Sequence, residues 1–187
     1  MANLMLEREP PEVLASRGQV IENTRSVGDF GRLSEIITAD LRELPDEKMP
    51  QQWRQVPVDI TLRFGWLKAR PGVPVVEGAV STRGPAVCQR CLGPVELPLD
   101  VLLKLLLPQS GMSSAGYEDF EVWEYDEHDV RPADIVEEAL IMALPFSALH
   151  RPDDCSAMPE PDQVDDSRTI RPFEDLKSLM ARADEKN

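Results

Sequence analysis

Aromatic side chains are scarce in this sequence, at 5% of its 187 residues. Cysteine is also rare, and its odd count of three argues against the disulfide framework of a small secreted domain. The first nine residues lack the continuous apolar segment of a signal peptide. We therefore expect a soluble, cytoplasmic protein. Hydrophobic residues make up 42% of the chain, so we expect a core built from Leu, Val and Ile.

Long hydrophobic runs are missing as well. The longest apolar stretch near the middle of the chain is Leu102–Leu107, and Lys104 interrupts it. A helix that crosses a bilayer needs roughly 20 mainly apolar residues. The sequence therefore predicts no membrane partner.

The motifs of several enzyme classes are absent from the sequence. It has no glycine-rich phosphate loop, no dinucleotide-binding glycine turn and no Gly-x-Ser-x-Gly nucleophile elbow. With only two histidines, a Ser–His or Cys–His pair would have to use one of them. We expect a protein that is not an enzyme, without catalytic residues, a small-molecule substrate or an organic cofactor.

Positive charge is in the minority. The chain has 20 Lys and Arg against 34 Asp and Glu, which gives a net charge of −14. Residues 110–187 carry −13 of this and residues 1–109 only −1. Such a charge disfavours binding an RNA backbone with the whole surface. A local basic patch along a sheet would draw on Arg54, Arg63, Lys68, Arg70, Arg83, Arg90 and Lys104.

Apolar residues recur at every second position in several segments, as expected of strands with one buried face. Strands are predicted at 20–23, 56–64, 73–82, 95–107 and 120–125. In the fourth of these, Pro98 cannot donate a ladder hydrogen bond, which indicates an edge position or a bulge. Leu102 and Leu106 share the face opposite the main apolar row, so the far end of this strand is expected to be covered on both sides.

Apolar residues at helical spacing, with prolines and polar caps nearby, predict the helices. The first is expected to start at Pro10 and Pro11 and to end at Gly18, and the others are expected at 29–44, 132–144 and 172–183. Asp29 and Asp129 are the expected caps of the second and third. The mixture predicts an α+β fold, an antiparallel β-sheet with a few flanking helices.

The composition also predicts where the domain ends. We expect a single α+β domain at 1–150. An acidic, disordered segment at 151–170 follows, rich in Asp and Pro and poor in large apolar residues. Residues 171–187 are expected to form a short helix and a tail.

The concentrated chemical signal is the C-Q-R-C motif at 88–91, between two predicted strands. Two thiols separated by two residues can bind one metal ion, because a tight turn brings both sulfur atoms to one side. A tetrahedral zinc site needs two more ligands, and Cys155 is the remaining thiol, with His150 five residues before it. Cys88, Cys91, Cys155 and His150 are therefore candidate ligands of a structural zinc ion.

Two other interpretations of the cysteine pair stay open. A redox pair is expected at a helix N-terminus, where the thiolate is stabilised, whereas this pair precedes a strand. The third interpretation is a turn whose cysteines are simply buried and bind no metal.

The segment 88–94, C-Q-R-C-L-G-P, resembles the signature of the YceD family, the large ribosomal RNA subunit accumulation proteins of bacteria and plastids. The helix at 134–145, which leads to His150 and Cys155, is similar to that of the family, and so is the ending at 171–179. The early segments 9–11 and 29–38 fit as well. Their order and spacing agree over nearly the whole chain.

This resemblance implies a non-enzymatic accessory role in the synthesis, processing or stability of large-subunit (23S) ribosomal RNA. The expected partner is this RNA, contacted directly or through a basic ribosomal protein or assembly factor. A net charge of −14 repels naked RNA and attracts a cationic protein. A metal-stabilised protein-interaction module outside ribosome biology is the alternative.

Overall fold

The computed structural model of the chain describes residues 4–69, 72–108, 119–123, 129–151 and 154–155. The chain divides into two units, Met1–Ser156 and Ala157–Asn187. All elements described below belong to the first unit. Most of the predicted acidic segment at 151–170 and the whole predicted helix at 172–183 lie outside the described residues. The expected domain boundaries stay predictions.

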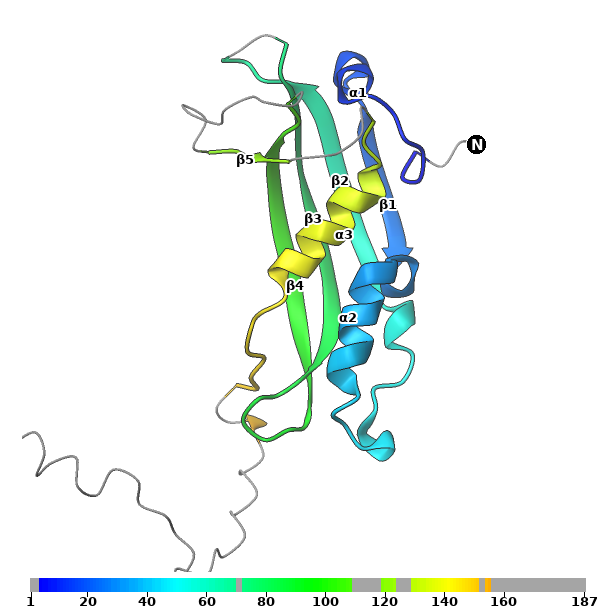
Figure 1. Ribbon diagram of the computed structural model, residues 1–187, viewed down its shortest axis with the longest axis vertical. Coiled ribbons are helices and arrows are strands. Elements are labelled where there is room, and N and C mark those ends of the chain that lie inside the picture. The colour runs from blue at the N-terminus through cyan, green and yellow to red at the C-terminus, as the bar shows by residue number, and fades with distance from the viewer. Residues whose placement is uncertain (1–3, 70–71, 109–118, 124–128, 152–153, 156–187) are drawn as a thin grey trace, which may run out of the picture. The chain divides into compact units, whose positions relative to one another are not determined.

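In the described part of the chain, five strands form a sheet in the order β1-β2-β3-β4-β5 (Figure 1). Their bounds are β1 Val20–Ser26, β2 Pro57–Trp66, β3 Pro74–Val87, β4 Pro94–Leu106 and β5 Glu121–Val122. Neighbours from β1 to β4 pair antiparallel, whereas the short β5 pairs parallel to β4. The expected α+β fold is confirmed, with β5 as a parallel addition at one edge.

The α-helices of the described residues are α1 Pro11–Arg17, α2 Gly31–Leu41 and α3 Pro132–Ala143. Short 3-10 helices lie at Val27–Asp29, Asp46–Lys48 and Trp53–Gln55. Both α1 and α3 begin with proline, whose missing N–H costs nothing in the first helical turn. Helices α2 and α3 pack on the same face of the sheet and contact each other (Figure 1). None of the described helices is long and apolar enough to cross a membrane.

The core lies between that face of the sheet and the helices. In β2, Val58, Ile60, Leu62 and Phe64 are buried, while the residues between them are more exposed. The helices contribute Leu14, Leu33, Ile37, Leu41, Ile135, Val136 and Leu140 to the same cluster. Removing these apolar surfaces from water is the main favourable contribution to folding. The alternation of apolar and polar residues in the sequence of β2 thus corresponds to an alternation of buried and more exposed side chains.

The outer edge of β4 is open along most of its length in the described structure. β5 pairs only with Leu105 and Leu106, and β3 occupies the other side of β4. Pro98 lies on the open part, where its lack of an N–H leaves no ladder bond unmade. The edge position expected from Pro98 is therefore confirmed.

Of the two leucines on the far face of β4, Leu106 is buried and Leu102 is exposed. Leu106 is buried in a small cluster with Leu67, Val73 and Val75. Leu102 is 85% exposed, so the expectation of cover on both sides is wrong there. Its cross-strand neighbour is Ala79, whose side chain is too small to cover it.

Neither expected aspartate caps its helix. The N-cap of α2 is Phe30, and the Asp29 carboxylate instead accepts a hydrogen bond of 3.0 Å from the backbone N–H of Ser26. The N-cap of α3 is Arg131, without a side-chain cap, so the expectation for Asp129 is also wrong. Asp29 lies one residue before the N-cap of α2 and Asp129 two residues before that of α3, outside the position from which a side chain caps the first turn.

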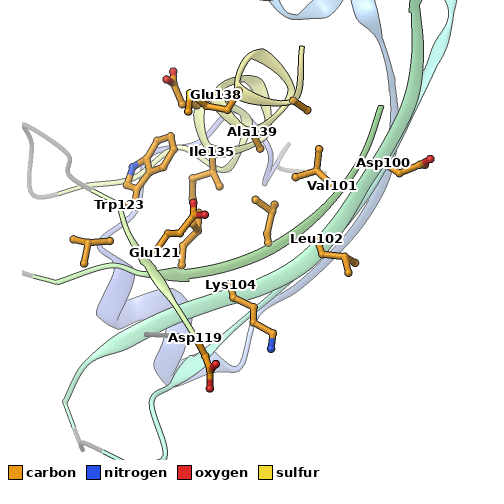
Figure 2. A pocket seen from close by; sticks show the side chains of 15 residues that line it. Asp100, Val101, Leu102, Lys104, Asp119, Glu121, Trp123, Ile135, Glu138 and Ala139 are labelled. Carbon is orange, nitrogen blue, oxygen red and sulfur yellow. The ribbon is translucent and has the colours of Figure 1, made fainter. Parts of the chain in front are cut away.

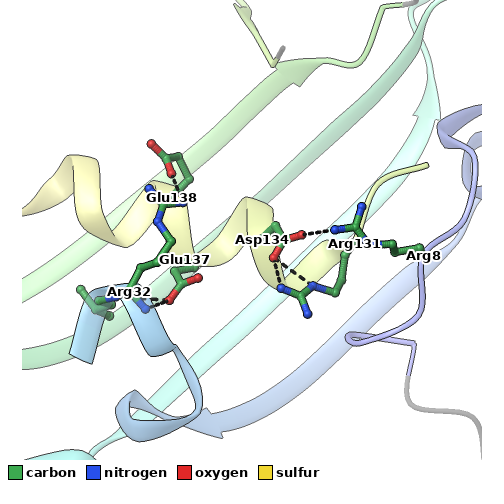
Figure 3. A network of polar contacts seen from close by, with 7 residues as sticks. Arg8, Arg32, Arg131, Asp134, Glu137 and Glu138 are labelled. Atoms are coloured by element: carbon green, nitrogen blue, oxygen red, sulfur yellow. Dashed lines mark hydrogen bonds and ion pairs between the residues drawn. The ribbon is translucent and has the colours of Figure 1, made fainter. Parts of the chain in front are cut away.

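A residue from another helix provides the cap of α2. Glu137 of α3 is buried, and its Oε1 accepts hydrogen bonds from the backbone N–H groups of Arg32 at 2.7 Å and Leu33 at 3.2 Å (Figure 3). A carboxylate at a helix N-terminus satisfies free donors and interacts favourably with the helix dipole. This contact couples the two helices that cover the sheet.

Candidate metal centre

The turn between β3 and β4 presents the two cysteines of the C-Q-R-C motif. The Cys88 N–H donates to the Gly93 carbonyl at 2.8 Å, and the Leu92 N–H donates to the Cys88 carbonyl at 2.8 Å. Leu92 adopts a left-handed backbone conformation with φ 55°. These bonds close the turn tightly, so that Cys91 folds back toward Cys88, as the motif predicted.

Two contacts hold this turn against the helical layer. Asp40, near the end of α2, accepts a hydrogen bond of 2.8 Å from the Val87 N–H. The carbonyl of Ala148, in the segment after α3, accepts one of 2.9 Å from the Gln89 N–H. The second contact brings the chain that carries His150 and Cys155 next to the turn.

All four predicted ligands come together. One ligand atom each from Cys88, Cys91, His150 and Cys155 lies within 4.8 Å of the other three. The Sγ atoms of Cys88 and Cys155 are 3.9 Å apart, and Cys91 Sγ lies 3.4 Å from His150 Nδ1. The three cysteines are free thiols.

Two of the separations, Cys88–Cys155 and Cys91–His150, fit the edges of a tetrahedron around zinc. Zn–S bonds of about 2.3 Å and Zn–N bonds of about 2.0 Å place two sulfur ligands about 3.8 Å apart and a sulfur and a nitrogen about 3.5 Å apart. The observed 3.9 Å and 3.4 Å agree with both values. Four protein ligands would leave no position for a substrate or a reactive water, which is typical of structural zinc sites.

The orientation of His150 suits metal binding. Its Nε2 lies 2.9 Å from the carbonyl oxygen of Pro94. Because a carbonyl can only accept, Nε2 carries the proton and Nδ1 presents its lone pair toward Cys91. A hydrogen bond of this kind holds many metal-binding histidines in one ring orientation.

The electrostatics around the sulfur atoms favour a cation. Burial opposes ionisation of Cys88, but backbone N–H groups of Cys91, His150 and Arg90 donate toward its sulfur, and its pKa is lowered to about 5. Burial raises the pKa of Cys155, and the neighbouring thiols Cys91 and Cys88 raise it further. A bound divalent cation would remove this conflict, because metal binding deprotonates coordinating thiols.

The two competing interpretations fit the structure less well. The pair lies in a turn between two strands, so it lacks the helix N-terminus that stabilises the thiolate of a redox pair. Cysteines merely buried in a turn would not require a third thiol and an oriented imidazole from a separate segment. The sequence indicated the four candidate ligands, which the structure brings together, but not the positioning contacts from Asp40, Ala148 and Pro94, which carry no sequence motif.

The basic residues considered for a patch on the sheet have acidic residues beside them. On the open face, Glu77 of β3 pairs across the strands with Arg63 of β2 and Lys104 of β4. Arg83 forms an ion pair of 2.8 Å with Glu96. Acidic neighbours thus offset three of the cations of this face. Arg70 lies outside the described residues.

Comparison with known proteins adds a finding that geometry alone does not supply. Residues 76–180, more than half of the chain, match the family described as "Large ribosomal RNA subunit accumulation protein YceD". The matched range includes the candidate ligands from Cys88 to Cys155. No curated protein and no solved structure matches the chain. The matched length and the position of the cysteine motif within it show that the chain belongs to the YceD family.

Proposed function

We propose that this protein is a non-enzymatic accessory factor in ribosome biogenesis that supports the synthesis, processing or stability of large-subunit (23S) ribosomal RNA. The observation that carries the proposal is the family match over residues 76–180. The family description names the accumulation of this RNA and no chemical reaction. Membership therefore favours this role over an interaction module outside ribosome biology. The cytoplasmic location stays a prediction.

The charge distribution supports an indirect mode of action. The chain carries a net charge of −14, and Arg63, Arg83 and Lys104 on the open face of the sheet have acidic neighbours. Such a surface repels phosphate groups and attracts cationic proteins. In this proposal the protein reaches ribosomal RNA mainly through a basic ribosomal protein or assembly factor.

Depletion of the protein in its own cells tests the role. We expect sucrose gradients to show fewer large subunits relative to small ones, and the level of large-subunit RNA to fall. Expression of the intact protein from a second copy restores both. A depleted strain with a normal gradient and normal RNA levels overturns the proposed role.

The four candidate ligands support a structural zinc ion as part of the same proposal. It would tie the β3–β4 turn to the segment that follows α3 and hold the two in one arrangement. The supporting observation is that ligand atoms of Cys88, Cys91, His150 and Cys155 lie within 4.8 Å of one another. Two of the separations, 3.9 Å and 3.4 Å, are close to those around zinc. A structural zinc ion contributes to folding because the unfolded chain offers no preformed site.

Metal analysis of the purified protein tests the zinc site. We expect close to one zinc per chain in the wild type and a loss of most of it in Cys88→Ser and His150→Asn. The matched control is His128→Asn, because His128 is the other histidine of the chain. A wild-type protein free of zinc after growth with added zinc contradicts the site, and so does a His150→Asn variant with full zinc content.

A further inference from the structure

A groove of about 620 Å³ follows the open edge of β4, between β5 and α3 (Figure 2). Apolar residues of β4 and α3 and the tryptophan directly after β5 line it, among them Val101, Trp123 and Met142. Met142 of α3 is 76% exposed, and Leu102, whose side chain lies on the opposite face of β4, is 85% exposed, which is high for large apolar residues. Exposed apolar side chains on both sides of an unpaired strand edge mark a site of interaction.

The strand beside the groove has free backbone groups. The Leu107 N–H donates to Pro74, on the β3 side, whereas the Leu106 carbonyl accepts from Trp123, on the opposite side. Backbone groups alternate in direction along a strand, so Asp100, Leu102 and Lys104 also point their N–H and C=O away from β3. In the described structure β5 pairs only at Leu105 and Leu106, so the N–H and C=O of Asp100 and Leu102 and the N–H of Lys104 have no strand partner.

The free segment has a defined length. Pro98 lacks an N–H and limits it on one side, and β5 begins to pair at Leu105 on the other. The part between them spans roughly 20 Å, given a rise of about 3.4 Å per residue. This is the length of a typical short strand.

The rim of the groove is acidic. Asp100, Asp119, Glu121 and Glu138 line it, against one cation, Lys104. Figure 2 shows Glu138 on the helix side and Asp100 and Lys104 on β4. Glu138 also pairs with Arg32 at 2.8 Å, which leaves three acidic groups against Lys104.

We propose that this groove binds an extended, cationic segment of a basic protein, which adds to the sheet as a strand along Asp100–Lys104. The inference rests on the proposed function, for which it names the docking site of the basic partner. Backbone hydrogen bonds from the free edge provide affinity, and the apolar floor accepts alternate side chains of the added strand. Lys and Arg side chains of the other set meet the acidic rim.

Other occupants fit these observations less well. A helix has no free backbone groups to pair with the β4 edge. An RNA strand would bring phosphates to the acidic groups at Asp100, Asp119 and Glu121. An extended basic peptide is the one partner that uses the free edge, the apolar lining and the charge together.

Amide hydrogen exchange followed by NMR tests the proposal on the full-length wild-type chain. The probe is a short synthetic peptide in which Lys alternates with Val, and its counterpart has Glu in place of Lys. We expect the Lys peptide to protect the amides of Leu102 and Lys104 from exchange, and the Glu peptide to leave them unchanged. The amides of Val101 and Leu103, which point to β3, are expected to be protected already in the free protein.

Variants of Leu102 separate edge pairing from simple charge attraction. Leu102→Pro removes the outward N–H at an exposed position, and the strand already holds a proline of this kind at Pro98. We expect the Lys peptide to bind this variant about tenfold more weakly. Leu102→Val keeps the N–H and an apolar side chain, so binding is expected to stay within about twofold of wild type. Circular dichroism and thermal unfolding confirm that both variants fold.

Three outcomes overturn the docking site. They are equal binding of the two peptides, unchanged exchange at Leu102 and Lys104 when the Lys peptide is bound, and full affinity in a folded Leu102→Pro variant. Gradients from cells that carry Leu102→Pro separate this inference from the proposed function. Full restoration of large subunits by that variant removes the groove as the docking site but leaves the role intact. Normal gradients after depletion remove the role but leave the measured peptide binding intact.

Discussion

The carboxylate of Asp29 stabilises the turn before α2 through its contacts with Ser26. It accepts hydrogen bonds from both the backbone N–H and the hydroxyl of Ser26, at 3.0 and 3.1 Å. The bond from the Ser26 backbone N–H is the largest cause that lowers the pKa of Asp29 below its usual 3.8. The Ser26 hydroxyl and the charge of Arg25 lower it further, whereas partial desolvation opposes them. The bonds are stronger to the ionised carboxylate than to the protonated one, so the stability they provide depends on pH.

We expect Asp29→Ala to lower the free energy of unfolding by about 1 kcal/mol at neutral pH, because it removes both hydrogen bonds from Ser26. Since the folded pKa is the lower one, this contribution is complete above the unfolded pKa and disappears as the pH falls through the folded pKa. Urea unfolding at a series of pH values measures it.

The difference between wild type and Asp29→Ala should therefore shrink below about pH 4. Asp29→Asn is the control, because it keeps an acceptor oxygen but cannot titrate. A wild-type advantage that stays constant into strong acid would show that the Ser26 contacts do not stabilise the folded chain.

The cysteine motif shows which contacts of the candidate metal site the sequence alone predicts. Cys88 and Cys91 are close in the sequence, so a tight turn alone brings their sulfur atoms together. Cys155 and His150 became candidate ligands because Cys155 is the one remaining thiol and His150 lies five residues before it. The hydrogen bond between Gln89 and Ala148 brings His150 and Cys155 to the turn, and no local sequence pattern predicts this bond.

At the scale of elements, Glu137 joins the two helices that cover the sheet. The sequence places Glu137 within a predicted helix, where a charged residue is ordinarily on the exposed face. In the structure it is buried and accepts from the first free N–H groups of α2, Arg32 and Leu33. The packing of α3 against α2 makes this bond and also determines which residue caps α2.

We expect Glu137→Ala to lower the free energy of unfolding by about 2 kcal/mol, because it leaves two N–H groups at a partly buried helix end without their acceptor. The neighbouring Glu138→Ala is the matched control. It removes an ion pair of 2.8 Å with Arg32 whose side chains are 62% and 34% exposed, and should cost less than about 1 kcal/mol. Chemical denaturation of both variants measures the difference, and equal losses would contradict the capping role.

At the scale of the whole molecule, charge is distributed unevenly along the chain. Residues 110–187 carry a net charge of −13, and residues 1–109 only −1. Among the described residues, Asp119, Glu121 and Glu138 of the acidic part lie at the groove beside β4. Long-range attraction of a cationic partner follows from this distribution and is screened by salt.

We expect the full chain to bind basic ribosomal proteins with an affinity that falls steeply with added salt, because the Debye length shrinks from about 10 Å at 0.1 M to about 3 Å at 1 M. Pull-downs from cell extract across a salt series measure this. Nuclease treatment is the control that separates protein contacts from RNA contacts. Recovery of ribosomal RNA without any ribosomal protein at moderate salt would contradict the indirect mode.

The strands and most helix positions were predictable from the sequence, since alternation and helical spacing reflect burial on one face of each element. The cysteine pair was predictable because its geometry is local. The sequence alone also determined the acidic character of the chain, which depends on composition only.

The tertiary structure decided the features that join distant segments. It placed His150 and Cys155 beside the cysteine turn, made Glu137 the cap of α2, and left the edge of β4 open next to an acidic groove. Each of these depends on packing between elements that lie far apart in the chain, and pairwise contacts of that kind leave no periodic trace in the sequence. The physical reason is that a residue's own neighbours fix its local conformation, whereas its partners across the core are chosen by how whole elements fit together.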